Sequence, residues 1–426
     1  MQQDSFVIRG DICYCETPQS LRLCPDSWLV CLEGHSAGVF PALPEQYAGL
    51  PVLDCAGSLV TPGLTDLHAH APQYALCGQG MDLELLDWLN RYIFPEESRY
   101  ASLDYADQAY RRFVEDVRRG PNTRVCVFAT VHWLATIRLM DLLEESGLCA
   151  MVGKVNMDRN CPDTIREASA AASAGRTRDW LEGIEGRYRR TRPILTPRFI
   201  PSCTDALLGE LGKIQRQYGL PVQSHLSENR GEIAWVRELC PGAKSYGDAY
   251  HAFGLFGGPA CPTIMAHCVY SEGEEAELLK ERNVFIAHCP ASNTNLSSGI
   301  APVRRFLRDG LRVGLGSDVA GGTHVSVFRA MADAIQVSKL RWRLVDQSLA
   351  PLTVREAFYL GTLGGGAFFG KVGSFAPGYE FDALVIDDAR YTPQRRMELK
   401  TRLERTVYLS DDRDIRHKFV QGRKIV

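Results

Sequence analysis

The chain has 426 residues, with 48 lysines and arginines against 51 aspartates and glutamates, which gives a formal net charge of −3 at pH 7. This near-balance argues against a nucleic acid or an anionic membrane surface as the main partner. No apolar run approaches the roughly 18 residues of a membrane span, and the opening MQQDSFVIRGD lacks the basic and apolar regions of a signal peptide.

Both ends of the chain are expected to form strands. Residues 1–57 contain short alternating stretches interrupted by Gly, Pro, Asp and Ser, and residues 373–426 return to a strand-like pattern. We therefore predict a small β-sandwich domain assembled from the two ends, beside a larger domain of residues 58–372.

The larger domain alternates short apolar stretches, rich in β-branched residues, with helical patterns. Nearly continuous apolar strands are typical of a parallel sheet covered by helices on both faces. The predicted strands are 58–66, 123–130, 149–157, 193–199, 221–227, 263–269, 284–290 and 311–319. Eight strands of this kind with helices between them predict an α/β fold, a (β/α)8 TIM-like barrel.

Helices are expected between these strands, most clearly at 204–218, 271–282, 302–308 and 323–339. Ser271 stands three residues before Glu274, which is the spacing of a capping box. The same spacing joins Thr353 to Glu356, so we expect a helix to begin at each pair. The long gap after the first strand contains an amphipathic segment at 81–97, which we expect to form a lid or a pocket wall.

The 14 cysteines show no CxxC pair and no zinc-type spacing with histidine. Several of them, such as Cys126, Cys268 and Cys289, stand inside apolar strand-like stretches. This usage is typical of reduced, buried thiols, so we expect a cytoplasmic protein.

Polar side chains, with Phe199 beside one of them, gather where the predicted barrel strands end. These residues are His68, His70, Arg198, Phe199, His225, Glu228, His267, His288 and Asp318. In a (β/α)8 barrel the carboxyl ends of all strands meet on one face, where active sites lie. We therefore expect most of these side chains to share one pocket, which His132 after the second strand could also line.

The pattern indicates a metal site. The two histidines of His68-Ala69-His70 are one residue apart, so they project to the same side of a strand. Imidazole suits zinc or iron, and a third histidine with a carboxylate would complete a shell that leaves one position for water. A lone histidine in a strand is more often structural, so the prediction depends on the joint placement of the set; we expect His288 to be structural or outside the shell. The fourth strand has no lysine that could bridge two ions, and Lys154 lies on the third strand, so we predict a single ion.

Six segments resemble the motifs of the amidohydrolase superfamily, metal-dependent hydrolases, and the similarity covers essentially the whole chain. They are TPGLTDLHAHAPQY, ILTPRF, QSHLSEN, MAHCV, AHCPASN and GLGSDVAGG. The insert DLELLDWLNRYIFPEE, together with TPRF and SHLSEN, is most similar to the guanine deaminases of that superfamily. Ala291 departs from the threonine-like residue expected in AHCPASN, but this position is not a ligand.

The resemblance implies a single zinc ion, with iron as an alternative, held by His68, His70, His225 and Asp318. It assigns proton transfer to Glu228 and Asp318 and the orientation of water to His267. The residues implied to contact the substrate are Gln73, Arg198, Phe199, His70, His225 and Glu228. The activity implied is hydrolytic deamination of guanine to xanthine and ammonia, in purine catabolism or salvage, by a homodimer.

Selectivity for guanine follows from its carbonyl at position 6, where adenine carries an amine. A cationic donor such as Arg198 would favour the carbonyl, although an ion pair at the strand end is the alternative role for this residue. Gln73 offers a donor and an acceptor together, or could make only a loop hydrogen bond. Phe199 could stack on a ring or belong to the core.

Two other functions remain open from the sequence. The same site could serve a related aminoazine, such as 8-oxoguanine, a pterin or a chlorotriazine, because these rings differ by few contacts. A non-enzymatic scaffold on this fold would be expected to lack some of the ligands, whereas every ligand position is filled here.

Overall fold

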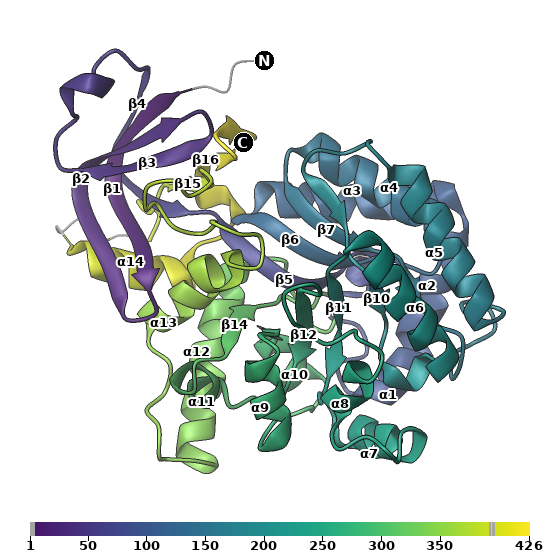
Figure 1. Ribbon diagram of the computed structural model, residues 1–426. Coiled ribbons are helices and arrows are strands. Elements are labelled where there is room, and N and C mark those ends of the chain that lie inside the picture. Colours follow the sequence, from purple (N-terminus) through teal and green to yellow (C-terminus); the bar gives the residue numbers. More distant parts are fainter. Residues whose placement is uncertain (1–4, 392, 394–396) are drawn as a thin grey trace.

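The computed structural model describes residues 5–391, 393 and 397–426. Figure 1 shows two sheets side by side: a barrel surrounded by helices, and a smaller sheet formed by the purple and yellow ends of the chain. Among the described helices none is long and apolar enough to cross a membrane.

The barrel contains eight strands in the spatial order β11-β12-β13-β14-β5-β6-β7-β9, and neighbouring strands are parallel. A parallel bridge between Leu195, just after β9, and Val222 in β11 closes the sheet. The strands are β5 (Leu64–His70), β6 (Asn122–Phe128), β7 (Cys149–Gly153), β9 (Thr191–Pro193), β11 (Val222–Leu226), β12 (Thr263–His267), β13 (Phe285–His288) and β14 (Arg312–Leu315). A short pair, β8 (Val155–Asn156) and β10 (Thr196–Pro197), extends one side. The predicted parallel barrel is confirmed.

The first barrel strand begins later than expected. Most of the predicted strand 58–66 belongs to β4 (Val52–Pro62) of the smaller sheet, and β5 begins only at Leu64. His68 and His70 therefore lie inside the strand rather than after it. Gly63 separates the two strands, and a Cβ atom there would lie 2.2 Å from the side chain of Thr123. The chain can pass this close to β6 only because residue 63 has no side chain.

Helices surround the barrel and bury their apolar faces against it (Figure 1). They are α3 (Leu103–Arg119), α4 (Trp133–Ser146), α5 (Ala170–Ile184), α6 (Asp205–Tyr218), α7 (Arg230–Leu239), α8 (Tyr246–His251), α9 (Glu274–Glu281), α10 (Pro290–Asn295), α11 (Val303–Arg308), α12 (Val327–Leu344) and α13 (Val354–Tyr359). The capping box of Thr353 and Glu356 is confirmed at the start of α13. The one expected at Ser271 is wrong, because α9 begins after Gly273 without a side-chain cap.

The smaller sheet has the order β17-β16-β15-β4-β1-β2-β3 and is mixed, since β1 runs parallel to β4 and its other neighbours are antiparallel. Besides β4 it contains β1 (Phe6–Thr17), β2 (Ser20–Leu32), β3 (His35–Phe40), β15 (Ala383–Ile386), β16 (Ile415–Val420) and β17 (Arg423–Lys424), and α14 (Leu399–Leu409) packs beside it. Its core includes Phe6, Phe381 and Phe419, whose rings contact one another. The sequence predicted that the two ends of the chain assemble together, as a β-sandwich; they do assemble, and their strands form a single mixed sheet.

The insert between β5 and β6 folds into short helical turns. These are η2 (Ala71–Leu76), α1 (Leu85–Trp88), η3 (Leu89–Ile93), α2 (Phe94–Ser98) and η4 (Arg99–Ala101). Their apolar side chains form a separate cluster with residues of the barrel mouth, among them Phe128 and Leu296. The insert is therefore packed onto the end of the barrel that carries the polar residues.

Candidate active site

The carboxyl ends of the barrel strands surround a pocket. Eight of the predicted residues line it: His70, Gln73, Arg198, Phe199, His225, Glu228, His267 and Asp318. The insert contributes one wall through Leu85, Trp88 and Leu89. Residues that lie between positions 70 and 318 of the sequence are therefore brought together in one place.

At the bottom of the cavity three histidines face one another. The Nε2 atom of His70 lies 3.1 Å from that of His68 and 3.3 Å from that of His225. The carboxylate of Asp318 completes the group, with Oδ1 3.1 Å from Nε2 of His68 and 3.4 Å from Nε2 of His70. His68, His70 and Asp318 are buried, and His225 is partly exposed. Three imidazole nitrogens thus lie close together, and the carboxylate oxygen of Asp318 lies beside those of His68 and His70.

The backbone fixes Asp318 against β5. The amide of Asp318 donates to the carbonyl of His68 at 2.8 Å, and the amide of His70 donates to the carbonyl of Val319 at 3.1 Å. Asp318 itself has a left-handed backbone, with φ of 46°, which is costly for a residue other than glycine and typical of functional turns. The carboxylate is consequently held at the histidines by the chain on both sides of it.

The charges in this group suit a divalent cation. Burial lowers the pKa of His70 and His225 well below the usual range, with a smaller contribution from His68, so both rings are neutral as metal ligands must be. Nδ1 of His225 donates to the carbonyl of Arg198 at 2.6 Å, which leaves Nε2 free to bind. Burial alone would raise the pKa of Asp318, but the neighbouring imidazoles outweigh it and hold the pKa well below its usual range. Neutral imidazoles beside a charged carboxylate are the donor set that zinc and iron accept.

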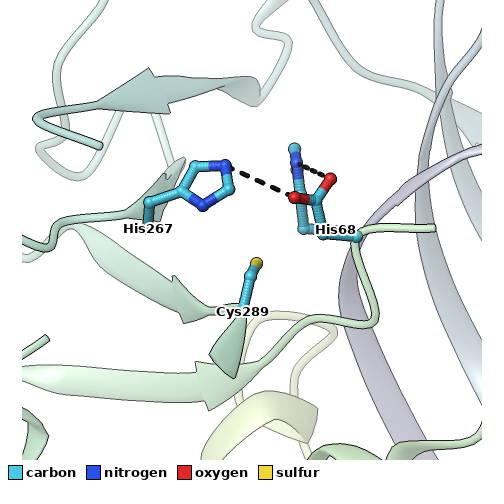
Figure 2. A group of neighbouring side chains, drawn as sticks. His68, His267 and Cys289 are labelled. Carbon is cyan, nitrogen blue, oxygen red and sulfur yellow. Dashed lines mark ion pairs between the residues drawn. The ribbon is translucent and has the colours of Figure 1, made fainter. Parts of the chain in front are cut away.

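A cysteine lies directly below this group. Figure 2 shows Cys289 beneath His68 and His267, where its sulfur stands within 4.8 Å of the nearest ring nitrogens and of the Asp318 carboxylate. Burial raises the pKa of this thiol well above its usual value, and the thiol donates to the carbonyl of Ala287 at 3.4 Å. Cys289 is therefore a neutral packing neighbour of the histidines, consistent with the buried thiols expected from the sequence.

Glu228 and His267 stand beside the histidine group. Oε2 of Glu228 lies 3.4 Å from Nε2 of His267, whose Nδ1 is 2.8 Å from Oδ1 of Asn293. The hydroxyl of Ser298 donates to Oε1 of Glu228 at 3.1 Å. Burial, and then the negative charge of Asp318, raise the pKa of Glu228 to about 8. Glu228 therefore holds a proton at neutral pH in these surroundings and can donate it into the cavity.

Gln73 and Arg198 form the polar part of the opposite wall. Both donate to one carboxylate, that of Glu97 in α2: the Gln73 amide at 2.9 Å and the Arg198 guanidinium at 2.6 Å. Arg198 also lies over the ring of Phe94, 5.2 Å from its centroid. The structure therefore gives Arg198 both roles considered from the sequence, since it lines the cavity and belongs to an ion pair.

Two of the predicted histidines stay outside the cavity lining. His288 ends β13 in the core, and neither ring nitrogen has a hydrogen-bond partner within the described part of the chain. Burial lowers the pKa of His288 to about 3, so the ring is neutral. His132 precedes α4, and its Nε2 is likewise buried without a partner. Lys154 is fully buried and paired with Glu167.

Comparison with known proteins assigns the family. A model of the amidohydrolase family matches residues 59–425. The chain belongs to the amidohydrolase family. It is 39% identical over 382 residues to a guanine deaminase of Dictyostelium discoideum, with 88% of this chain and 84% of the relative covered. It is 40% identical over 380 residues to that of Mus musculus, covering 86% and 82%. The crystal structure of guanine deaminase from C. acetobutylicum, with guanine bound in its active site, matches with a TM-score of 0.96 and 46% identity, covering 99% of this chain and 100% of the other.

Three buried carboxylates of this amidohydrolase site were missed by the sequence analysis. Asp66 accepts from the amides of His68 and Ser317, at 3.1 and 3.0 Å, and so ties β5 to the segment that carries Asp318. Glu232 accepts from the amide of Glu228 at 3.0 Å. Glu97 accepts from the side chains of Gln73 and Arg198.

Of these, Glu232 alone had a usable signal. Asn229 and Glu232 have capping-box spacing, and the structure contains that box at the start of α7. The contacts of Asp66 and Glu97 depend on residues far away in the chain, so no local pattern could have found them.

Proposed function

We propose that this amidohydrolase is a guanine deaminase, which hydrolyses guanine to xanthine and ammonia. The observation that carries the proposal is one cavity that combines a cluster of histidines with an aspartate, a protonated glutamic acid and an arginine beside an amide. The similarity to guanine deaminases along most of the chain supports the same activity.

We further propose that one zinc ion binds per chain, held by His68, His70, His225 and Asp318. The converging Nε2 atoms and the carboxylate oxygen fit such an ion, and iron would accept the same donors. When bound, the ion supplies Lewis acidity that lowers the pKa of water to near neutrality.

The side chains then divide the proton transfers between them. Asp318, charged at neutral pH, accepts a proton from the attacking water as its oxygen bonds to C2 of guanine. Glu228 donates its proton to the ring nitrogen beside C2, which makes that carbon a better electrophile. His267, fixed by Asn293, orients the water. Asp318 then returns its proton to the amine, the C2–N bond breaks to release ammonia, and Glu228 regains a proton from the new hydroxyl as the carbonyl of xanthine forms.

Recognition of guanine is assigned to the wall opposite Glu228. Arg198 supplies N–H donors for the carbonyl at position 6, and Gln73 supplies an amide for the edge of the ring. Adenine would present an amine to the cation and leave these donors unpaired, which opposes its binding. Phe199, 5% exposed at the cavity, supplies an apolar surface for the ring.

The deciding experiment measures turnover of guanine by the purified protein, with xanthine and ammonia as products and metal content determined on the same sample. We expect rapid turnover at about one zinc per chain. Adenine, 8-oxoguanine, a pterin and a chlorotriazine serve as competing substrates, and each should react more slowly. A metal-loaded protein that leaves guanine unchanged would contradict the proposal and favour another aminoazine. Light scattering would test whether the protein is a homodimer, as we also propose.

A further inference from the structure

Among the described residues of the insert, Glu97 alone binds both Gln73 and Arg198, the two polar side chains assigned to the recognition of guanine. Its Oε1 accepts from Nε2 of Gln73 and its Oε2 from Nη1 of Arg198, at 2.9 and 2.6 Å. The carboxylate is buried, with its side chain 2% exposed, and Arg198 is 3% exposed. No solvent competes for these hydrogen bonds, so they fix the two side chains firmly.

We propose that Glu97 is a positioning residue that determines specificity, because it sets which atoms of Gln73 and Arg198 face the substrate. This inference rests on the proposed function. An amide can present either its oxygen or its nitrogen to a ligand, but a carboxylate beside it accepts only from the nitrogen. Glu97 therefore orients the amide of Gln73 and directs its carbonyl oxygen away from α2. That oxygen becomes an acceptor for the N–H groups of guanine.

Glu97 also controls the charge of the wall. A buried guanidinium without a counter-ion would attract anionic ligands and would be costly to bury. Paired with Glu97, Arg198 keeps N–H donors for a carbonyl oxygen while the pair carries no net charge. The wall then suits a neutral ring with a carbonyl group, rather than an anion. In this way α2, which supplies no metal ligand, defines the class of substrate.

The substitution Glu97→Gln tests this role, because the new carboxamide has nearly the same size. Its single oxygen can accept from only one of the two partners, and its amino group faces the other donor. We expect KM for guanine to rise about tenfold or more, with kcat changed less than about threefold and metal content unchanged. Inhibition by urate, a purine anion at neutral pH, should strengthen relative to guanine binding because Arg198 loses its counter-charge. Glu97→Asp keeps the charge and should raise KM less than Glu97→Gln.

Glu96 provides a matched control in the same helix. It is 6% exposed and contacts Arg99 and Tyr105 rather than the cavity residues, so Glu96→Gln should leave KM for guanine unchanged. Because Glu97 acts through its partners, the double variant with Glu97→Gln and Gln73→Ala should raise KM for guanine by less than the product of the two single increases.

Either of two results would overturn the inference: a wild-type KM in Glu97→Gln, or a parallel loss of kcat, folding and metal in both Glu97 variants. If Glu97→Gln does not fold, the KM of Glu97→Asp decides, and an unchanged value overturns the inference. Absence of guanine turnover by the metal-loaded wild type would instead refute the proposed function, and this inference with it. The wild-type assay therefore separates the two failures.

Discussion

Glu228 and Asp318 lie in one cavity, but their surroundings shift their pKa values in opposite directions. Burial and the charge of Asp318 raise the pKa of Glu228 to about 8. Burial acts on Asp318 in the same sense, yet the imidazoles around it outweigh burial and hold its pKa well below the usual range. Two carboxyl groups separated in this way supply an acid and a base at the same pH. The division of roles between them therefore follows from their neighbours rather than from their chemical type.

The substitution Glu228→Gln should abolish most of the turnover while the metal stays bound. Glutamine keeps the size of the side chain and can still accept from Ser298, but its amide N–H groups are too weakly acidic to transfer a proton to the ring nitrogen. Positioned proton transfer is typically worth about 100- to 10,000-fold, so kcat should fall by a factor in that range. Steady-state kinetics with metal analysis on the same sample measures both quantities, and near-normal kcat would show that another group is the acid.

At the scale of elements, short-range patterns predicted where helices and strands exist better than where they begin. The strand expected at 58–66 combined two separate elements, because β4 and β5 follow each other with only Gly63 between them. Both are apolar and buried, so periodicity alone could not divide them. The polar residues at the strand ends were nevertheless located correctly, since the carboxyl ends of parallel strands meet in any such barrel. Glu97 could not be predicted, because its partner Arg198 is 101 residues away and the contact exists only in the folded chain.

The two predicted capping boxes offer a direct test of element-scale reasoning. Thr353 accepts from the amide of Glu356 at 3.3 Å, and the Glu356 carboxylate accepts from the amide of Thr353 at 2.9 Å. Thr353→Ala should therefore lower the free energy of unfolding by about 1 kcal/mol. Ser271 is the matched control: its hydroxyl caps no helix, because α9 begins after Gly273 without a side-chain cap, so Ser271→Ala should cost less than Thr353→Ala. Urea unfolding of both variants gives the comparison, and equal losses would refute the assignment of the caps.

At the scale of the whole molecule, the barrel and the terminal sheet are joined by a buried ion pair. Arg124 in β6 donates to both carboxylate oxygens of Asp382, at 2.6 and 3.0 Å, and the two side chains are 3% and 0% exposed. Asp382 also accepts from the amide of Gln421, which leads into β17. The pair of Arg124 and Asp382 thus connects β6 of the barrel to the C-terminal segment, at Asp382 and, through Gln421, just before β17. Strand β6 pairs with β5, which carries His68 and His70.

Removing one partner of this pair should be far more damaging than removing both. Asp382→Leu leaves the Arg124 cation buried, with the partly exposed Glu380 as its remaining partner, and should lower the free energy of unfolding by about 3–5 kcal/mol. Arg124→Met leaves the Asp382 carboxylate buried without its cation and should be similarly costly. In the double variant neither fully buried charge remains, and Glu380, which loses Arg124, is partly exposed to water, so much of that loss should be recovered. Urea unfolding of the wild type and the three variants completes the cycle. The expectation would be wrong if the double variant lost as much unfolding free energy as the two single variants together, because the two residues would then act independently. The barrel and the terminal sheet would in that case be held together chiefly by their apolar contacts.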